Sequence, residues 1–274
     1  MMTLRLPQGL KSVAQAAVPA ISYLVEHRRS DEWVGAFQAF LGAVRGLGAG
    51  TGLLECEALC ASRFVSRSVN APTIIDAGAN VGDWSIAMSR LLHNKAVIYM
   101  FEPLPAAREV AASRACAGSE IIPLALGDRI EERDLLIAHA LDTTASFHPR
   151  GDSVAAGREY RGERIKVTTL DHFLTERQIQ RVDFLKMDLE GHEFAALKGA
   201  TDALAAKVIL ALSFEFGSSN LNSRVFFYDL YHLLTSHSYK LKRMLPTGRL
   251  IPITYYNEDL EFFARTSTYF ASLE

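Results

Sequence analysis

The stretch that decides the fold is residues 74–82, which read IIDAGANVG. An apolar run leads into a glycine-rich turn, and a segment whose apolar residues have helical spacing begins at Gly82. A strand that passes through a tight glycine turn into a helix is typical of α/β sheets, which bind nucleotide-like ligands at the carboxyl ends of their strands. The stretch therefore predicts a wound α/β domain with a ligand site at this turn.

The spacing of the glycines distinguishes between two classes of ligand. A dinucleotide fingerprint, G-x-G-x-x-G, would require glycines where this chain has Asn80 and Asp83. Asp76 stands just before the turn, and its carboxylate would repel a pyrophosphate. A ligand with a sulfonium and an amino group, and without a phosphate, meets no such repulsion. The turn therefore favours S-adenosylmethionine.

Two further polar residues follow the next strands of the predicted sheet. Glu102, in FEP at residues 101–103, ends the second strand, where it can accept hydrogen bonds from both ribose hydroxyls. Asp128 ends the third, where its side chain can reach an adenine amino group. Polar residues at three successive strand ends favour a cofactor pocket over a plain strand-to-helix corner. The predicted cofactor-binding residues are Asp76, Gly78, Ala79, Asn80, Gly82, Glu102, Pro103 and Asp128.

A third motif, DFLKMDLEGHE at residues 183–193, completes a family resemblance. Together with the glycine turn, the FEP motif, TLD at 169–171 and KGA at 198–200, it resembles the FkbM family of S-adenosylmethionine-dependent methyltransferases. The resemblance covers residues 73–265. It implies a Rossmann-like class I methyltransferase fold and O-methylation, often of sugars or polyketide-type hydroxyls. A small-molecule or glycan acceptor is therefore expected.

The third motif also supplies candidates for the chemistry. Methyl transfer is an in-line displacement, so the acceptor oxygen must be aligned with the methyl carbon, and a sugar hydroxyl needs a base. Four candidate catalytic residues lie at predicted strand ends: Asp188, Glu190, His192 and Glu215. The imidazole has a suitable intrinsic pKa, and Asp188 or Glu190 can orient the hydroxyl. Alternatively, Glu190 has no part in catalysis and only interacts favourably with the positive N-terminal end of a helix.

A metal site is a second alternative for the same residues. Clustered carboxylates and an imidazole are compatible with a hard cation such as Mg²⁺. Their spacing does not demand one, so a divalent metal is not expected to take part.

The pattern from residue 73 onward predicts parallel βαβ units, because short apolar runs alternate with amphipathic segments. The expected fold is a mostly parallel central sheet with helices on both faces and an antiparallel edge hairpin. Strands are expected at 73–76, 96–102, 120–126, 135–139, 164–169, 182–188, 208–216, 239–242, 250–253 and 260–264, and helices at 82–93, 105–116, 170–178, 193–197 and 225–237.

Residues 1–70 predict a helical extension to a methyltransferase domain at 71–274. Five apolar residues recur at helical spacing: Trp33, Phe37, Phe40, Leu41 and Val44. The extension is interpreted as a lid or as an oligomer contact that makes a homodimer. The longest uncharged stretch, Ser12 to Val25, is too short to span a bilayer, so no transmembrane segment is expected.

Composition excludes other classes of function. The chain has 274 residues, with 29 Lys and Arg against 31 Asp and Glu, and a formal net charge of −2. No basic field exists to hold nucleic acid. The cysteines are Cys56, Cys60 and Cys116, which fit neither a disulfide framework nor a paired C-x-x-C zinc site, and they favour a cytoplasmic location.

Two alternative functions remain open from the residues. A nucleotide-dependent oxidoreductase would need the glycines that this turn lacks. A non-catalytic Rossmann-like module would bind a ligand or partner without chemistry, but such a relic would be expected to lose the acidic residues at the strand ends, which are all present.

Overall fold

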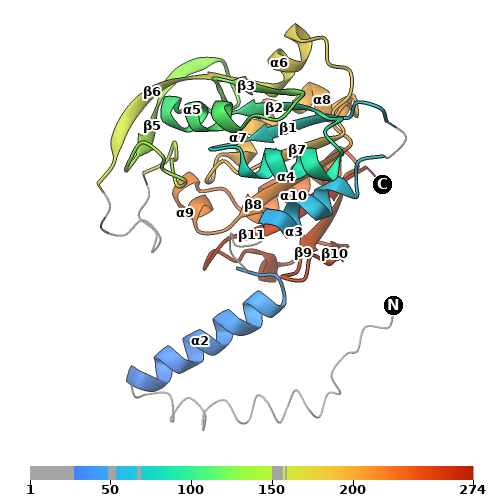
Figure 1. The fold of residues 1–274 in the computed structure, drawn as a ribbon. Coiled ribbons are helices and arrows are strands. Elements are labelled where there is room, and N and C mark those ends of the chain that lie inside the picture. The colour runs from blue at the N-terminus through green and yellow to red at the C-terminus, as the bar shows by residue number, and fades with distance from the viewer. Residues whose placement is uncertain (1–27, 49–53, 67–68, 150–156, 158, 274) are drawn as a thin grey trace.

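An eight-stranded sheet forms the centre of the protein, in the order β10-β9-β11-β8-β7-β1-β2-β3 (Figure 1). The computed structural model describes residues 28–48, 54–66, 69–149, 157 and 159–273. The strands of the sheet are β1 (Thr73–Ala77), β2 (Val97–Phe101), β3 (Ser119–Ile122), β7 (Phe184–Met187), β8 (Ala211–Phe216), β9 (Lys240–Met244), β10 (Leu250–Ile253) and β11 (Ser267–Ser272).

The sheet is parallel through its middle and antiparallel at one edge. β1 pairs in parallel with β2 and with β7, and β8 continues this direction. β11 lies antiparallel between β8 and β9, and β9 and β10 form an antiparallel hairpin at the edge. This arrangement confirms the predicted Rossmann-like class I fold with its edge hairpin.

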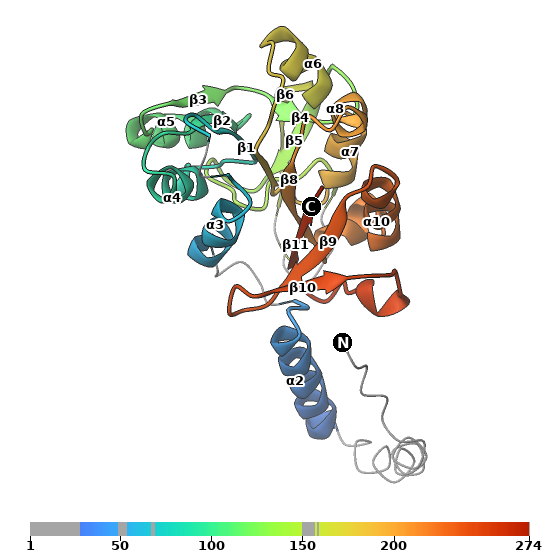
Figure 2. The same ribbon diagram turned by 90° about the vertical axis from the view of Figure 1, so that its right-hand side faces the viewer.

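Helices cover both faces of the sheet (Figure 2). Alternate residues of each central strand point to opposite faces, so Ile74 packs beneath one helical layer and Ile75 beneath the other. One layer is α3 (Leu54–Ser62), α4 (Asp83–Leu91) and α5 (Pro105–Arg114); the other is α6 (Leu170–Glu176), α7 (Glu193–Lys198), α8 (Thr201–Ala205) and α10 (Phe227–Ser236). Burial on both faces explains why the central strands are almost continuously apolar.

A second, three-stranded sheet corrects the prediction for residues 120–126. These residues form two strands, because the chain leaves the central sheet after Ile122 and enters the small sheet at Ala125. Pro123 lies at the break and has no N–H for a strand ladder. The small sheet has the order β4-β6-β5, with β4 (Ala125–Leu126), β5 (Glu131–Ile137) and β6 (Arg161–Thr168).

The prediction for the last strand was also wrong. Residues 258–260 form a 3₁₀ turn, η1 (Glu258–Leu260), in which the Asn257 side chain accepts a hydrogen bond from the Asp259 N–H at 3.1 Å. The strand is β11, and all six of its residues are buried. It therefore lacks the alternation of a half-exposed strand. A short helix, α9 (Ser219–Ser223), follows β8.

The helix α2 (Arg28–Val44) projects away from the body of the protein (Figures 1 and 2). Its aromatic side chains are largely exposed, with Trp33 78% and Phe37 60% accessible. The loop after α2 is anchored, because the Gly48 N–H donates to the Ser267 Oγ at 2.8 Å. The uncharged stretch at 12–25, part of the predicted helical extension, lies outside the described residues.

The helix α3, in contrast, belongs to the core. Its Ala58, Cys60 and Ala61 are buried with Ile74 and Trp84 of the domain. Within the described part of the chain, no helix has the length and apolar character needed to cross a membrane.

Candidate active site

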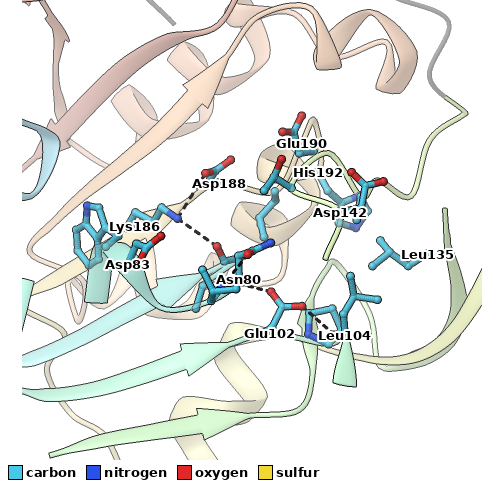
Figure 3. A pocket seen from close by; sticks show the side chains of 18 of the residues that line it. Asn80, Asp83, Glu102, Leu104, Leu135, Asp142, Lys186, Asp188, Glu190 and His192 are labelled. Carbon is cyan, nitrogen blue, oxygen red and sulfur yellow. Dashed lines mark hydrogen bonds and ion pairs between the residues drawn. The ribbon is translucent and has the colours of Figure 1, made fainter. Parts of the chain in front are cut away.

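A cavity of about 260 Å³ opens at the carboxyl ends of β1, β2 and β7 (Figure 3). Its lining includes the glycine turn, the Glu102 segment and the loop after β7, together with a loop from the small sheet. Of the twelve residues predicted for cofactor or chemistry, eight line it: Gly78, Ala79, Asn80, Glu102, Pro103, Asp188, Glu190 and His192. The remaining four are Asp76, Gly82, Asp128 and Glu215.

The glycine turn is held against β2 and β7. The N–H groups of Gly78 and Ala79 both donate to the carbonyl oxygen of Phe101 at 3.0 Å. Gly78 has φ 78°, and a side chain there would overlap the carbonyl oxygen of Asp188. Only glycine satisfies both conditions. The turn ends at Gly82, where α4 begins as predicted.

Glu102 is fixed in place by the backbone around it. Its Oε2 accepts the N–H of Asn80 and its Oε1 accepts the N–H of Leu104, both at 2.8 Å. Burial raises the pKa of Glu102, although these two N–H donors oppose the rise. Each carboxyl oxygen can still accept a second hydrogen bond from a ligand in the cavity.

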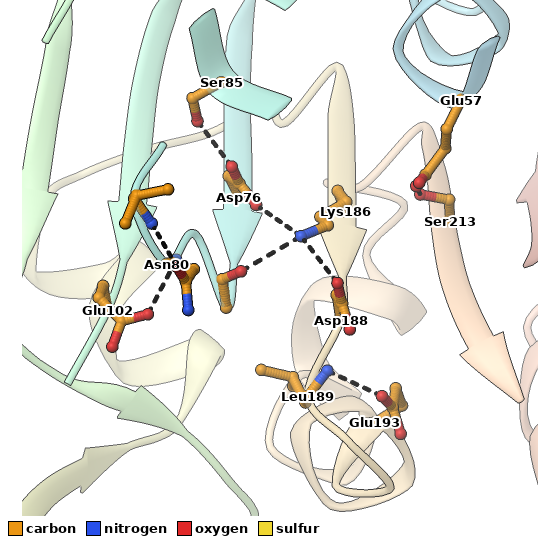
Figure 4. A network of polar contacts seen from close by, with 12 residues as sticks. Glu57, Asp76, Asn80, Ser85, Glu102, Lys186, Asp188, Leu189, Glu193 and Ser213 are labelled. Atoms are coloured by element: carbon orange, nitrogen blue, oxygen red, sulfur yellow. Dashed lines mark hydrogen bonds and ion pairs between the residues drawn. The ribbon is translucent and has the colours of Figure 1, made fainter. Parts of the chain in front are cut away.

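Asp76 lies beneath the cavity. Its side chain is fully buried, its Oδ2 accepts the hydroxyl of Ser85 at 2.7 Å, and its Oδ1 lies 3.2 Å from the Nζ of Lys186 (Figure 4). Asp76 therefore stabilises the floor of the site, and neither it nor the helix cap Gly82 is part of the lining.

The loop after β7 presents the acidic residues. The Asp188 side chain is 36% exposed, and its Oδ2 lies 3.6 Å from the Lys186 Nζ. Glu190 has φ 50° and Gly191 has φ 93°, so the chain turns sharply here. The Glu193 Oε1 accepts the N–H of Leu189 at 2.8 Å, which closes the turn. These contacts hold Asp188 and Glu190 at the rim of the cavity.

His192 is poorly suited to act as the base. Its side chain is buried, and its Nδ1 lies 3.5 Å from the Nε2 of His148. Burial lowers the pKa of His192 to about 3, and the charges of His148 and Arg133 add to this effect. The ring is therefore neutral at pH 7, and so weak a base removes a hydroxyl proton inefficiently.

Glu215 lies outside the lining, half-buried on β8. Burial raises the pKa of Glu215 well above its usual value, and the nearby Asp188 and Glu57 raise it further.

Asp128 also lies outside the lining. Its Oδ1 is 3.2 Å from the Nε of Arg129 and its Oδ2 is 3.2 Å from the Nζ of Lys198. The hydrogen bond from Arg129 is the main cause that lowers the pKa of Asp128 to about 2. It follows β4 of the small sheet and not a strand of the central sheet.

A loop of the small sheet also forms part of the cavity wall. Asp142 in this loop is buried and lines the cavity (Figure 3). Its Oδ1 accepts the N–H of Thr144 at 2.8 Å and its Oδ2 accepts the N–H of Ala138 at 2.7 Å. Phe147 is also buried in this wall. The other residues of this wall that line the cavity are Leu135, Thr143 and Ala145.

The lining also contains residues that sequence reasoning missed. Lys186 and Trp84 come from β7 and α4, and Leu54 comes from α3. A lysine within the apolar strand Phe184–Met187 was the available signal, because a lysine is almost never fully buried unless it is paired. Among the residues that the structure describes, no group of three or more His, Cys, Asp or Glu side chains is placed to hold a metal ion.

The family follows from a comparison with known proteins. A family profile described as the methyltransferase FkbM domain matches residues 76–241, more than half of the chain. The chain belongs to the FkbM methyltransferase family. It is also 27% identical over 159 residues to the methyltransferase sdnD of Sordaria araneosa; the alignment covers 48% of this chain and 61% of that protein.

Solved structures give more remote likenesses. The chain is similar to a putative rRNA-methylase from Clostridium thermocellum, with 9% identity, a TM-score of 0.44, and coverage of 81% of this chain and 96% of that one. It is also similar to the precorrin-6y C5,15-methyltransferase of Geobacter metallireducens GS-15, with 8% identity, a TM-score of 0.40, and coverage of 78% and 86%. The strand order, and not these likenesses, identifies the fold.

S-adenosylmethionine is the cofactor of FkbM methyltransferases. The geometry of Glu102 is the main observation that fits the cavity to this molecule. Both oxygens of Glu102 are fixed by backbone N–H groups and can each accept a hydroxyl of a ribose.

The helix α3 precedes the residues that match the FkbM profile, but it reaches the site. Ser213 donates its hydroxyl to the Oε1 of Glu57 at 3.1 Å (Figure 4). Burial raises the pKa of Glu57 to about 7; Lys186 opposes this rise, and Asp188 and Asp76 add to it. A carboxyl group from outside the family domain thus titrates near neutral pH beside the site.

Replacement of Glu57 by Gln should change how stability depends on pH. The pKa of Glu57 is raised from 4.5 to about 7 in the folded protein, so the folded state binds more protons than the unfolded state between these values. Its contribution to stability is therefore lost as pH rises through this window. The melting temperature of Glu57→Gln, measured relative to the wild type, should increase from pH 5 to pH 8.

A matched control is Glu55→Gln, an exposed position on the same helix. It should follow the wild type at every pH. Parallel melting curves for Glu57→Gln and the wild type would contradict the assignment of a raised pKa to Glu57.

Proposed function

We propose that the protein transfers the methyl group of S-adenosylmethionine to a hydroxyl group, most plainly that of a sugar in a glycan or a natural product. One observation carries the proposal. A single cavity holds a backbone-fixed carboxylate suited to a ribose, Glu102, and a partly exposed carboxylate suited to an acceptor hydroxyl, Asp188. Both lie at the carboxyl edge of the sheet, where such folds bind their ligands.

The cofactor would lie along the glycine turn, with its ribose on Glu102. The apolar side chains of Leu104, Leu135 and Phe147 continue the cavity beyond Glu102 and suit a flat adenine ring. At the other end, Asp76 and Asp188 share the single cation Lys186. The net negative charge of these three groups favours a sulfonium and weakens after transfer, when the product is a neutral thioether.

The transfer step needs alignment and a proton acceptor. An oxygen lone pair of the acceptor forms the bond to the methyl carbon, and the electrons of the breaking carbon–sulfur bond stay on sulfur. The hydroxyl proton passes to a carboxylate. Asp188 is the residue we assign to this role, because its side chain is partly exposed in the cavity, whereas His192 is buried and Glu215 lies outside the lining. Glu190, beside it on the rim, can orient neighbouring hydroxyls of a sugar.

The helix α2 is proposed as a contact between two copies of the chain. Residues 33–44 contain no charged side chain, and Trp33, Phe37, Phe40, Leu41 and Val44 are all exposed. A helix with such an apolar stripe gains free energy when it is covered, and a second α2 offers an equally uncharged surface.

We propose a cytoplasmic location because the cysteines are not paired in disulfides. Cys56, Cys60 and Cys116 are free thiols, as expected for a protein of a reducing compartment.

Glu102→Gln should weaken the binding of S-adenosylhomocysteine about 10- to 100-fold. The amide presents an NH₂ group where a backbone N–H needs an acceptor, and a hydrogen bond to a charged group contributes about 1.5–3 kcal/mol. Isothermal calorimetry measures the dissociation constant. Glu109→Gln, at an exposed position on α5, is the control and should bind as the wild type does. Failure of the wild type to bind S-adenosylhomocysteine would sink the proposed function.

Mass spectrometry of products from a panel of sugars and hydroxylated natural products tests the reaction. The expected product carries a methyl group on oxygen, which fragmentation distinguishes from a methyl group on nitrogen or carbon. Asp188→Asn should lower kcat about 10²- to 10⁴-fold, the range that general bases contribute. Methylation found only on nitrogen or carbon acceptors would contradict O-methylation.

Phe37→Glu should convert a dimer into a monomer, because it places a charge in the apolar stripe of α2. Analytical ultracentrifugation at several protein concentrations measures the association. Gln38→Glu adds the same charge beside the stripe and should leave the dimer intact. A wild-type protein that stays monomeric at all concentrations would refute the α2 contact.

A further inference from the structure

The least expected group in the site is the ammonium of Lys186, in the middle of the central sheet. Its side chain is 7% exposed, although it lies on a strand whose other residues are all apolar. A charge in this position is costly unless it is paired and hydrogen-bonded. The contacts of Lys186 therefore indicate which groups offset the cost of burying its charge.

The contacts of Lys186 reach three different parts of the site. Its Nζ donates to the carbonyl oxygen of Gly78 at 3.2 Å, and lies 3.2 Å from the Oδ1 of Asp76 and 3.6 Å from the Oδ2 of Asp188 (Figure 4). The contact with the Gly78 carbonyl is a hydrogen bond, and the two carboxylates are ion-pair partners. Lys186 thus contacts protein groups of the glycine turn, of β1 and of the loop after β7.

A polar row across the sheet leads from Lys186 to two helices. Strand register places Asp76 of β1, Lys186 of β7 and Ser213 of β8 side by side. Ser85 of α4 donates to Asp76 at one end of the row, and Ser213 donates to Glu57 of α3 at the other. The helices that cover this face are therefore tied to the same row as the lysine.

We propose that Lys186 is the positioning residue that holds the cofactor turn and the acceptor carboxylate at a fixed separation, through its simultaneous contacts with Gly78 and Asp188. This role rests on the proposed function, in which the turn carries the methyl donor and Asp188 the acceptor hydroxyl. In-line transfer depends on the distance and angle between these two, and a misplacement of 1 Å can cost about 10²-fold in rate.

The charge of the cofactor supports a role without direct contact. A sulfonium is repelled by an ammonium, so Lys186 gains nothing from touching it. The two carboxylates beside the lysine compensate its charge and leave the site negative overall. Lys186 therefore acts through Gly78 and Asp188.

The test compares two variants, because Lys186→Met alone leaves Asp76 buried and unpaired and is expected to unfold. Asp76→Asn removes that charge and serves as the reference. The double variant Asp76→Asn/Lys186→Met then removes the lysine from a neutral floor. Relative to the reference, kcat should fall about 10- to 100-fold, while the dissociation constant of S-adenosylhomocysteine changes less than about threefold.

A further readout separates positioning from mere stability. With S-adenosylhomocysteine bound, amide hydrogen exchange should quicken at residues 188–193 and stay slow at residues 78–82. Equal kcat and equal exchange in the two variants would overturn the role of Lys186.

Failure of the proposed function would look different. If the wild type methylates no acceptor, that proposal fails, and the amide-exchange comparison still decides whether Lys186 couples the turn to the loop of Asp188. A double variant that folds but loses S-adenosylhomocysteine binding would also overturn the positioning role, because Lys186 would then be needed for the cofactor itself.

Discussion

The close approach of β1 and β7 at their carboxyl ends is the constraint on which the site depends. The two strands pair in parallel, and the chain leaves β1 through Gly78, so near to the carbonyl oxygen of Asp188 that no side chain fits. The same approach brings the cofactor turn and the acidic loop into one cavity. Asn80, Glu102 and Asp188 belong to segments far apart in the sequence and meet here because each follows a strand that ends at the same edge of the sheet.

The parts of the fold with a local signal could be predicted from the sequence. The glycine turn and Glu102 can be recognised from short motifs along the chain, and both lie in the expected elements. The strand at 120–126 was mispredicted because its apolar run continues past Pro123, while the backbone changes sheets there. The strand β11 was missed because burial on both faces removes alternation.

The site was harder to predict where it depends on tertiary contacts. Asp128 follows a strand as expected, but that strand belongs to the small sheet, and its carboxyl group pairs with Arg129 and Lys198 outside the cavity lining. Asp142 has no motif of its own, and it lies in the wall only because β5 and β6 bring its loop over the cavity. Glu57 lies on α3, before the family match, and nothing in its local sequence places it beside Ser213.

Electrostatics divides the carboxyl groups of the site into two kinds. Glu57 and Glu193 are buried without a cation of their own, and their pKa values rise to about 7 and about 8. Asp76 and Asp188 share Lys186. Of these two carboxyl groups, Asp188 is the one that is open to a ligand, since Asp76 is fully buried.

We propose that S-adenosylmethionine binds at this edge of the sheet, between the glycine turn and the wall of the small sheet. Amide hydrogen exchange of the wild type, with and without S-adenosylhomocysteine, locates the binding site. Exchange should slow at residues 78–84, 101–105 and 142–147, and remain unchanged in α2. Protection elsewhere, with none at the glycine turn, would contradict the account.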